Sequence, residues 1–267
     1  MSTLGIGIVG AGKHGIRYAR HVTEDVPDAK LVAICRRNRK EGEAVAATYG
    51  CAFHDDWQTL IDDPRVDAVV TVVPPVFNRP IAEAVCRARK PILLEKPVSV
   101  TVADGQRIAA AVAAAGVPAM VAHTMRYDAT VNAVKAHLPA IGTLHSVGLT
   151  QRFEPTRLDW LDRPEESGGG IVLHTGVHSM DLLRVLTGRE VVDVSCVMTR
   201  VLTRDTEDNF VMLARMNAEG LLAHVAGSRA LDGRTGLMEF AGEGGQIVAD
   251  HVHRLAWLVR GGGDPFL

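Results

Sequence analysis

The sequence carries little net charge, few cysteines and no long hydrophobic run. A formal net charge of −2 gives no support for nucleic acid or a membrane surface as a partner. No apolar stretch reaches the roughly 20 residues that a membrane-spanning helix needs. The first strand is expected to begin near Leu4, which leaves no room for a signal peptide. We therefore expect a cytoplasmic protein.

Cysteine usage agrees with that expectation. The four cysteines are Cys35, Cys51, Cys86 and Cys196, and no two of them have the C-x-x-C spacing. They fall in or beside predicted strands and helices, so we expect reduced and mostly buried thiols.

The stretch from Ile6 to Arg37 predicts a dinucleotide-binding unit. It reads as an apolar strand, the glycine motif Gly10-Ala11-Gly12-Lys13-His14-Gly15, a helix, and a second apolar strand. In such a unit the first glycine permits a tight turn, the second lets the backbone approach a pyrophosphate, and the third lets helix and strand pack closely. The phosphates would lie at the positive end of the helix that begins near Lys13.

The end of the second strand favours NADP as the cofactor, with NAD as the alternative. An NAD enzyme usually has an acidic residue there for the ribose 2′-hydroxyl, whereas arginine accommodates the 2′-phosphate of NADP. The sequence reads Cys35-Arg36-Arg37-Asn38-Arg39-Lys40, with no carboxylate in position. Arg36 and Arg37 can bind a phosphate through charge-assisted hydrogen bonds. The same residues also fit a solvated basic loop.

The rest of the chain predicts two domains with different sheets. Strands alternate with helices up to about residue 122, which predicts a Rossmann-type, doubly wound parallel sheet in an α/β domain over residues 1–122. From residue 123 to 267 most strands follow one another without helices, which predicts an α+β domain with a mostly antiparallel, open sheet.

Five motifs together resemble one enzyme family. In chain order they are the glycine motif, Val73-Pro74-Pro75, Glu95-Lys96-Pro97, Arg126-Tyr127, and Gly168-Gly169-Gly170 followed by Gly176-x-His178-x-x-Asp181. Each is weak alone, but their order and spacing are specific. The chain resembles the glucose-fructose oxidoreductase, inositol dehydrogenase and rhizopine catabolism (Gfo/Idh/MocA) family over nearly its whole length. The resemblance implies that the second domain, with or without the further C-terminal helices that relatives have, binds substrate and joins copies into a homodimer or homotetramer through its open sheet.

The resemblance implies catalytic roles for Lys96, His178 and His174. It implies that Lys96 lies where nicotinamide and substrate meet, that His178 faces it from the second domain, and that Pro97 has a cis peptide bond. Hydride transfer to a carbonyl leaves an alkoxide that must be protonated, and the reverse reaction needs a base. A buried lysine and a histidine suit both tasks. The alternative for Lys96 is a surface lysine at a strand end.

His174, His178 and Asp181 have spacings of four and three, which places them on one face of a helix predicted over residues 171–186. Relatives commonly have aspartate where this chain has His174, so that imidazole is either catalytic or packed in the core. A metal site built on the two histidines is a weaker alternative, because the sequence has no H-E-x-x-H motif or cysteine cluster.

The remaining candidates are assigned by position or by resemblance. Two of them have a structural alternative: Asn78 can cap the following helix without binding cofactor, and residues 123–127 can form a polar hinge without binding substrate. The predicted cofactor-binding residues are Gly10, Gly12, Lys13, His14, Gly15, Arg36, Arg37, Pro74, Asn78, Glu95 and Lys96. The predicted substrate-binding residues are Lys96, His123, Arg126, Tyr127, His174 and His178, with Arg152, Glu154, Arg157, Asp159 and Trp160 suggested by position alone.

The resemblance therefore implies an NAD(P)-dependent oxidoreductase that interconverts a secondary alcohol and a carbonyl on a sugar, a sugar derivative or a cyclitol. Two other functions remain open on the same fold. One is a non-catalytic NADP-binding regulator. The other is a hydrolase or lyase that uses the bound dinucleotide only as a transient oxidant.

Overall fold

Two β-sheets organise the chain, and each belongs to a separate unit. The computed structural model describes residues 3–156 and 158–260. Its two units are Met1–Ala122 with Glu165–Gly168, and His123–Pro164 with Gly169–Leu267. The predicted fold class is confirmed, because the first unit has a parallel sheet and the second a mostly antiparallel one.

Sheet A, in the first unit, has six parallel strands in the order β3-β2-β1-β4-β5-β6. The chain order reverses between β1 and β4, and in sheets of this kind ligands bind beyond the carboxyl ends of the strands at that point. Two strands are shorter than the apolar runs at 66–73 and 117–123 suggested. The strands are β1 (Leu4–Val9), β2 (Ala29–Cys35), β3 (Ala52–His54), β4 (Ala68–Thr71), β5 (Ile92–Leu94) and β6 (Ala119–Val121).

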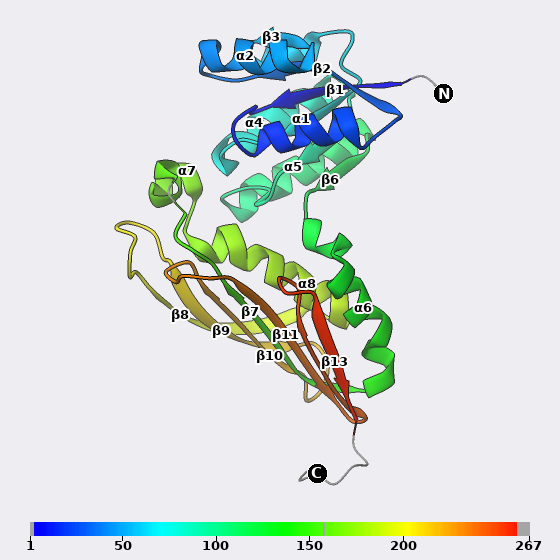
Figure 1. Cartoon of the computed structure of the whole chain (residues 1–267), viewed down its shortest axis with the longest axis vertical. Helices are drawn as coiled ribbons and strands as arrows, with labels where there is room; N and C mark the ends of the chain where they lie inside the picture. The colour runs from blue at the N-terminus through cyan, green and yellow to red at the C-terminus, as the bar shows by residue number, and fades with distance from the viewer. Residues whose placement is uncertain (1–2, 157, 261–267) are drawn as a thin grey trace. The chain divides into compact units, whose positions relative to one another are not determined.

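Helices cover both faces of sheet A (Figure 1). One face packs against α1 and α2 through a core that includes Ile8, Ala19 and Ala46. The other packs against α3, α4 and α5 through a core that includes Leu60, Val85 and Ile108. The helices are α1 (Gly15–Glu24), α2 (Arg39–Tyr49), α3 (Trp57–Asp62), α4 (Asn78–Arg87) and α5 (Val102–Ala115), with a 3-10 turn η1 (Pro75–Phe77) before α4.

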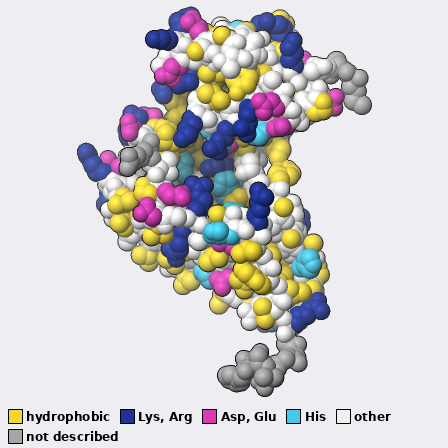
Figure 2. Space-filling model, viewed as in Figure 1, with side chains coloured by type: hydrophobic (Ala, Val, Ile, Leu, Met, Phe, Trp, Pro, Cys, Tyr) yellow, Lys and Arg dark blue, Asp and Glu magenta, His cyan; other side chains and the backbone are white. Residues whose placement is uncertain are grey.

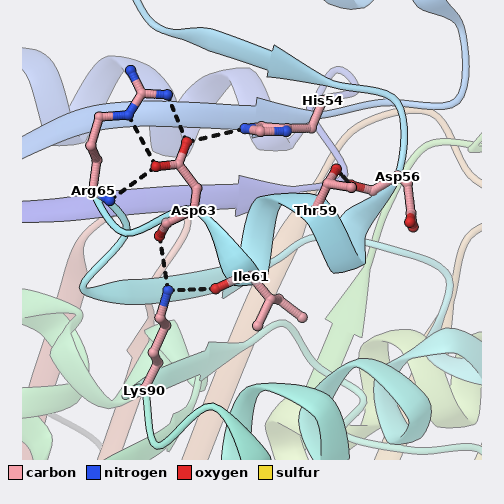
Figure 3. Close-up of polar contacts among 7 residues, drawn as sticks. All are labelled: His54, Asp56, Thr59, Ile61, Asp63, Arg65 and Lys90. Carbon is pink, nitrogen blue, oxygen red and sulfur yellow. Dashed lines mark hydrogen bonds and ion pairs between the residues drawn. The ribbon is translucent and has the colours of Figure 1, made fainter.

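Asp63 fixes the end of α3 (Figure 3). Its buried carboxylate accepts from the Arg65 guanidinium at 2.6 and 3.0 Å and lies 3.2 Å from the His54 ring nitrogen. The Lys90 ammonium donates to the carbonyl oxygens of Ile61 and Asp63. The bonds from Arg65 outweigh burial and hold the pKa of Asp63 well below its usual range. These contacts join α3 to β3 and to the segment before β5.

Sheet B, in the second unit, has seven strands in the order β13-β12-β11-β7-β10-β9-β8. Only β7 and β10 pair in parallel, and the other pairs are antiparallel. Its strands are β7 (Leu144–Arg152), β8 (Val191–Thr199), β9 (Asn209–Met216), β10 (Leu222–Ser228), β11 (Thr235–Gly242), β12 (Gly245–Asp250) and β13 (Leu255–Val259).

Helices α6 and α8 lie on one face of sheet B (Figure 1). Val134 of α6 and Leu183 of α8 share a core with Leu149, Phe240 and other strand residues. The helical segments of this unit are η2 (Thr124–Tyr127), α6 (Ala129–His137), η3 (Leu138–Ile141), η4 (Asp159–Asp162), a π-helix η5 (Val172–Gly176) and α8 (Val177–Thr187). The short helix α7 (Pro164–Ser167) belongs mostly to the first unit.

The opposite face of sheet B has no helix among residues 3–156 and 158–260. In β9, Phe210 and Met212 are buried, whereas Val211 and Leu213 between them are more than half exposed at 54% and 61%. Trp257 of β13 is 51% exposed. Hydrophobic side chains thus reach the surface of the second unit, as Figure 2 also shows from one side.

No helix in the described part of the chain is long and apolar enough to cross a membrane.

Candidate active site

The glycine loop has the geometry that its sequence predicts. Gly10 has φ +98°, and a Cβ there would lie 2.1 Å from the Val72 carbonyl oxygen, so a larger residue cannot replace it. A Cβ on Gly12 would meet nothing within 4 Å, which leaves open space beside the loop. The first turn of α1 has no side-chain cap, and an anion beside the loop would lie at the positive end of this helix. The residues present therefore fit a dinucleotide pyrophosphate.

His14 and Tyr18 hold the carboxylate of Glu95. They lie one turn apart at the start of α1, with their rings edge to face at 5.6 Å. The His14 Nε2 lies 2.8 Å from Glu95 Oε1, and the Tyr18 hydroxyl donates to the same oxygen at 2.6 Å. The Lys96 backbone N–H donates to the other oxygen, Oε2, at 3.0 Å. Three donors from two elements thus fix the carboxylate.

These contacts set the charges beside Lys96. Burial acts to raise the pKa of Glu95, but the hydrogen bonds from His14 and Tyr18 outweigh it and leave the pKa below its ordinary value. Burial lowers the pKa of the Lys96 ammonium, and the negative charge of Glu95 opposes that shift. Burial and the bond to Glu95 raise the pKa of Tyr18 far above its ordinary value, so its hydroxyl remains a donor.

Asn78 holds the Glu95–Pro97 backbone and does not cap a helix. The prediction of a cap is wrong, because α4 begins at Asn78 itself, its N-cap is Phe77, and no side chain caps it. Asn78 is 1% exposed. Its amide donates to the carbonyls of Pro97 at 3.1 Å and Glu95 at 3.4 Å, and accepts from Thr71 at 3.3 Å. The Lys96–Pro97 peptide bond is cis, as predicted.

Arg36 and Arg37 differ in their surroundings. The Arg36 guanidinium donates to the Ala11 carbonyl at 3.2 Å and pairs with the Glu41 carboxylate. The sequence reading missed Glu41, because it lies in the first turn of α2 and not at the end of β2. Arg37 is exposed, and within residues 3–156 and 158–260 it forms no ion pair. Lys13 is exposed in the glycine loop, and Pro74 precedes η1.

In the second unit, Arg126 is bound to Asp181. Its Nε and Nη2 donate to the two carboxylate oxygens at 2.7 and 2.5 Å, and this bond raises the pKa of Arg126. His123 Nδ1 lies 3.8 Å from Asp181 Oδ2, and the His123 and His178 rings meet edge to face at 6.3 Å. These predicted residues are therefore brought together, whereas Tyr127 is 68% exposed.

The helix that carries the histidines is not one regular α-helix. Val172–Gly176 is a π-helical turn, and the α-helix begins only at Val177. His174 therefore lies in the π turn, whereas His178 and Asp181 lie in the α-helix and both are near His123. His174 is 8% exposed, with its ring edge to face on Trp160 at 5.3 Å, while His178 packs against His123. The two imidazoles therefore occupy different environments.

Glu207, which the sequence reading missed, holds the start of this segment. Its carboxylate accepts from the N–H groups of Gly170 at 2.9 Å and Val172 at 3.0 Å, and its carbonyl accepts from Ile171 at 2.9 Å. A Cβ on Gly170 would lie 1.9 Å from that carbonyl oxygen, so the close approach requires glycine. Gly176 also allows close packing, because its Cβ would lie 2.9 Å from the Phe210 ring.

Of the residues suggested by position alone, Glu154 pairs with Arg234 at 2.8 Å and Trp160 packs on His174. Arg152 is exposed at the end of β7, and Asp159 begins η4. Arg157 lies outside the described residues. Over residues 3–156 and 158–260, no group of three or more histidine, cysteine or acidic residues is arranged to hold a metal ion.

Two family profiles match the chain. Residues 4–123 match "Oxidoreductase family, NAD-binding Rossmann fold", and residues 139–248 match "GFO/IDH/MocA C-terminal domain". The chain belongs to the Gfo/Idh/MocA family. The chain is also similar to inositol 2-dehydrogenase 1 of Saccharopolyspora erythraea. The two are 35% identical over 76% of this chain and 60% of that protein's length.

Solved structures agree with this assignment. A probable dehydrogenase from Thermotoga maritima is 28% identical, with a TM-score of 0.85 over 92% of this chain and 75% of its own. GenD2 from gentamicin A biosynthesis, in complex with NAD, is 27% identical, with a TM-score of 0.89 over 94% of this chain and 73% of its own. This Gfo/Idh/MocA chain spans 55–60% of the length of the first curated relatives that it matches.

Proposed function

We propose that the chain is an NADP-dependent oxidoreductase that interconverts a secondary alcohol and a carbonyl on a sugar, a sugar derivative or a cyclitol. The observation that carries this proposal is the Glu95–Lys96–Pro97 segment, which is clamped at the carboxyl end of β5 with burial lowering the pKa of Lys96. Lowering the pKa of an amine brings it closer to neutral pH, where a general acid or base is most effective.

In this proposal, different residues of the chain bind the cofactor, move the proton and orient the substrate. A bound nicotinamide cofactor would supply the redox chemistry, and the glycine loop would hold its pyrophosphate. Lys96 and His178 would move the substrate hydroxyl proton, and His174 would orient the substrate or relay the proton. The inositol 2-dehydrogenase of Saccharopolyspora erythraea supports a cyclitol or sugar as the substrate class.

The test is a turnover screen of inositols, sugars and anhydrosugars with NADP and NAD. Lys96→Ala should keep cofactor binding within about threefold and lose several orders of magnitude in kcat, because the proton-moving group is removed. Lys135→Ala, on the exposed side of α6, is the matched control and should be unchanged. Unchanged turnover in Lys96→Ala would contradict the role.

The same screen separates the other functions. Cofactor binding without turnover of any polyol would favour a regulator. Product formation without net change in cofactor redox state would favour a hydrolase or lyase.

The preference for NADP rests on Arg37. Its exposed guanidinium follows β2, where a ribose 2′-phosphate would lie, whereas Arg36 is occupied by Glu41 and the Ala11 carbonyl. The NAD bound to GenD2 supports the alternative cofactor. Arg37→Ala should weaken NADP binding about tenfold and leave NAD binding unchanged, because one charge-assisted contact to phosphate is lost. Arg107→Ala on α5 serves as the control. Tighter binding of NAD than NADP by the unaltered chain would reverse the assignment.

We also propose that the open face of sheet B joins copies of the chain into a homodimer or homotetramer. Val211, Leu213 and Trp257 expose apolar surface there, and surfaces of this kind mark protein contacts. Leu213→Glu should lower the mass measured by light scattering to that of a monomer. Val102→Glu, at a 79% exposed position on α5, should not. A monomeric unaltered chain at high concentration would contradict the proposal.

A further inference from the structure

The cluster of His14, Tyr18 and Glu95 links the glycine loop to the Lys96 segment by direct bonds. Two side chains from the first turns of α1 donate to one carboxylate oxygen, and the Lys96 backbone N–H donates to the other. Glu95 is 7% exposed. A buried carboxylate is anionic only if donors compensate for the water it has lost, and here three donors do so.

The bond to the Lys96 N–H also fixes the carboxylate relative to the lysine. The backbone on either side is held by the Asn78 amide, which donates to the carbonyls of Glu95 and Pro97. The position of the negative charge with respect to Lys96 is therefore set by the fold. A fixed negative charge near an amine favours the ammonium form, and the effect is larger where water is excluded.

The contacts described above keep Glu95 anionic and Tyr18 neutral. The negative charge beside Lys96 is therefore that of Glu95, and His14 and Tyr18 hold its carboxylate in place from the start of α1.

We propose that Glu95 is a positioning residue that sets the proton affinity of the Lys96 amine, and that His14 and Tyr18 act on that amine only through the carboxylate that they hold. The titratable groups in this arrangement are His14 and Tyr18 from α1, and Glu95 and Lys96 after β5. The inference rests on the proposed function only in treating Lys96 as the proton-moving group.

The test measures Lys96 directly and needs no turnover. The rate of acetylation of Lys96 by acetic anhydride is followed by peptide mass spectrometry from pH 6 upward, on the full chain without substrate. The rate follows the fraction of unprotonated amine, so the midpoint of the profile reports proton affinity and the plateau reports access. Lys135, exposed on α6, is the internal standard.

Three variants separate charge from shape. Glu95→Gln keeps an acceptor and removes the charge, so the Lys96 midpoint should fall by about one pH unit or more, which is about a tenfold faster rate below the midpoint. Tyr18→Phe removes a neutral donor and should move the midpoint by less. His14→Gln keeps a donor to the carboxylate and should likewise move the midpoint by less than Glu95→Gln does.

A midpoint in Glu95→Gln equal to that of the unaltered chain would overturn the proposal. So would an equal shift in Tyr18→Phe, because the effect would then come from lost packing and not from charge. A shift in His14→Gln as large as that in Glu95→Gln would overturn it as well. If Lys96→Ala kept full turnover while Glu95→Gln moved the midpoint, the proposed function would fail and this inference would stand.

Discussion

Replacing Asn78 tests whether its buried side chain stabilises the protein by holding the Glu95–Pro97 backbone. Asn78→Ala removes two N–H donors from carbonyls at 3.1 and 3.4 Å and an acceptor from the Thr71 hydroxyl at 3.3 Å. Asn78 and Thr71 are 1% and 0% exposed, so water cannot easily replace these bonds. A buried polar group that loses its partner costs about 1–3 kcal/mol. Because two of the three bonds are long, we expect a loss of about 2–4 kcal/mol in the free energy of unfolding.

Asn78→Asp distinguishes the clamp from a helix cap. Aspartate caps helices as well as asparagine does, so a cap would survive this change. A carboxylate has no N–H to donate and would face two carbonyl oxygens in a buried site, so a clamp would be lost. We therefore expect Asn78→Asp to be no more stable than Asn78→Ala.

Asn38 supplies the matched control, because its side chain does cap α2 by accepting from the Glu41 N–H at 3.2 Å. Asn38→Ala should cost about 1 kcal/mol and Asn38→Asp almost nothing. Stability is measured by urea unfolding, with the slope compared between variants to show that the same transition is followed. Cofactor affinity and kcat are measured on the same samples. We expect kcat to fall in the Asn78 variants, because the backbone on either side of Lys96 is no longer held. Asn78→Asp with the stability of the unaltered chain would refute the reasoning.

Three further predictions concern the second unit. Glu207→Ala should cost about 1–3 kcal/mol in unfolding and lower kcat without changing cofactor affinity, whereas Glu207→Gln should restore part of both. Burial acts to raise the pKa of Asp162, but the backbone N–H groups of residues 204–206 hold it at about 2. Its stabilising contribution is therefore complete above about pH 4 and lost as the pH falls toward 2, so acid unfolding of Asp162→Asn should be flatter across that window. Arg126→Ala should destabilise more than Asp181→Asn, since it removes both guanidinium hydrogen bonds from a buried carboxylate, and a double-mutant cycle in urea should show coupling of about 1–3 kcal/mol.

Local sequence rules were sufficient for most of the first unit. The glycine motif and the alternation of apolar strands with helices are signals between residues close in sequence, and the structure has both. Asn78 was misread because η1 inserts a 3-10 turn after Pro74. That turn carries the chain into α4 one residue earlier than expected, so Asn78 is already inside the helix and its side chain turns toward β5.

Contacts between distant residues could not be predicted in this way. Arg126 and Asp181 are 55 residues apart, and Gly170 and Glu207 are 37 residues apart. Periodicity places each residue on an element but does not say which other element its side chain meets. The π turn at His174 was missed for a related reason, because the spacing of apolar residues in this segment also suits a regular helix.

The two units therefore differ in whether the contacts that position their predicted site residues come from neighbouring or from distant parts of the chain. In the first unit the glycine loop follows directly from β1, and its backbone is fixed by close contact with the neighbouring strand at Val72. In the second unit, the start of the segment that carries His174 and His178 is held by hydrogen bonds to Glu207, which follows β8 in the chain. A change in the β8–β9 connection can thus displace both imidazoles without altering any residue of their own helix. For this reason substrate preference in this chain should depend on positions that no motif around the histidines contains, whereas cofactor binding should depend on residues that the motif names.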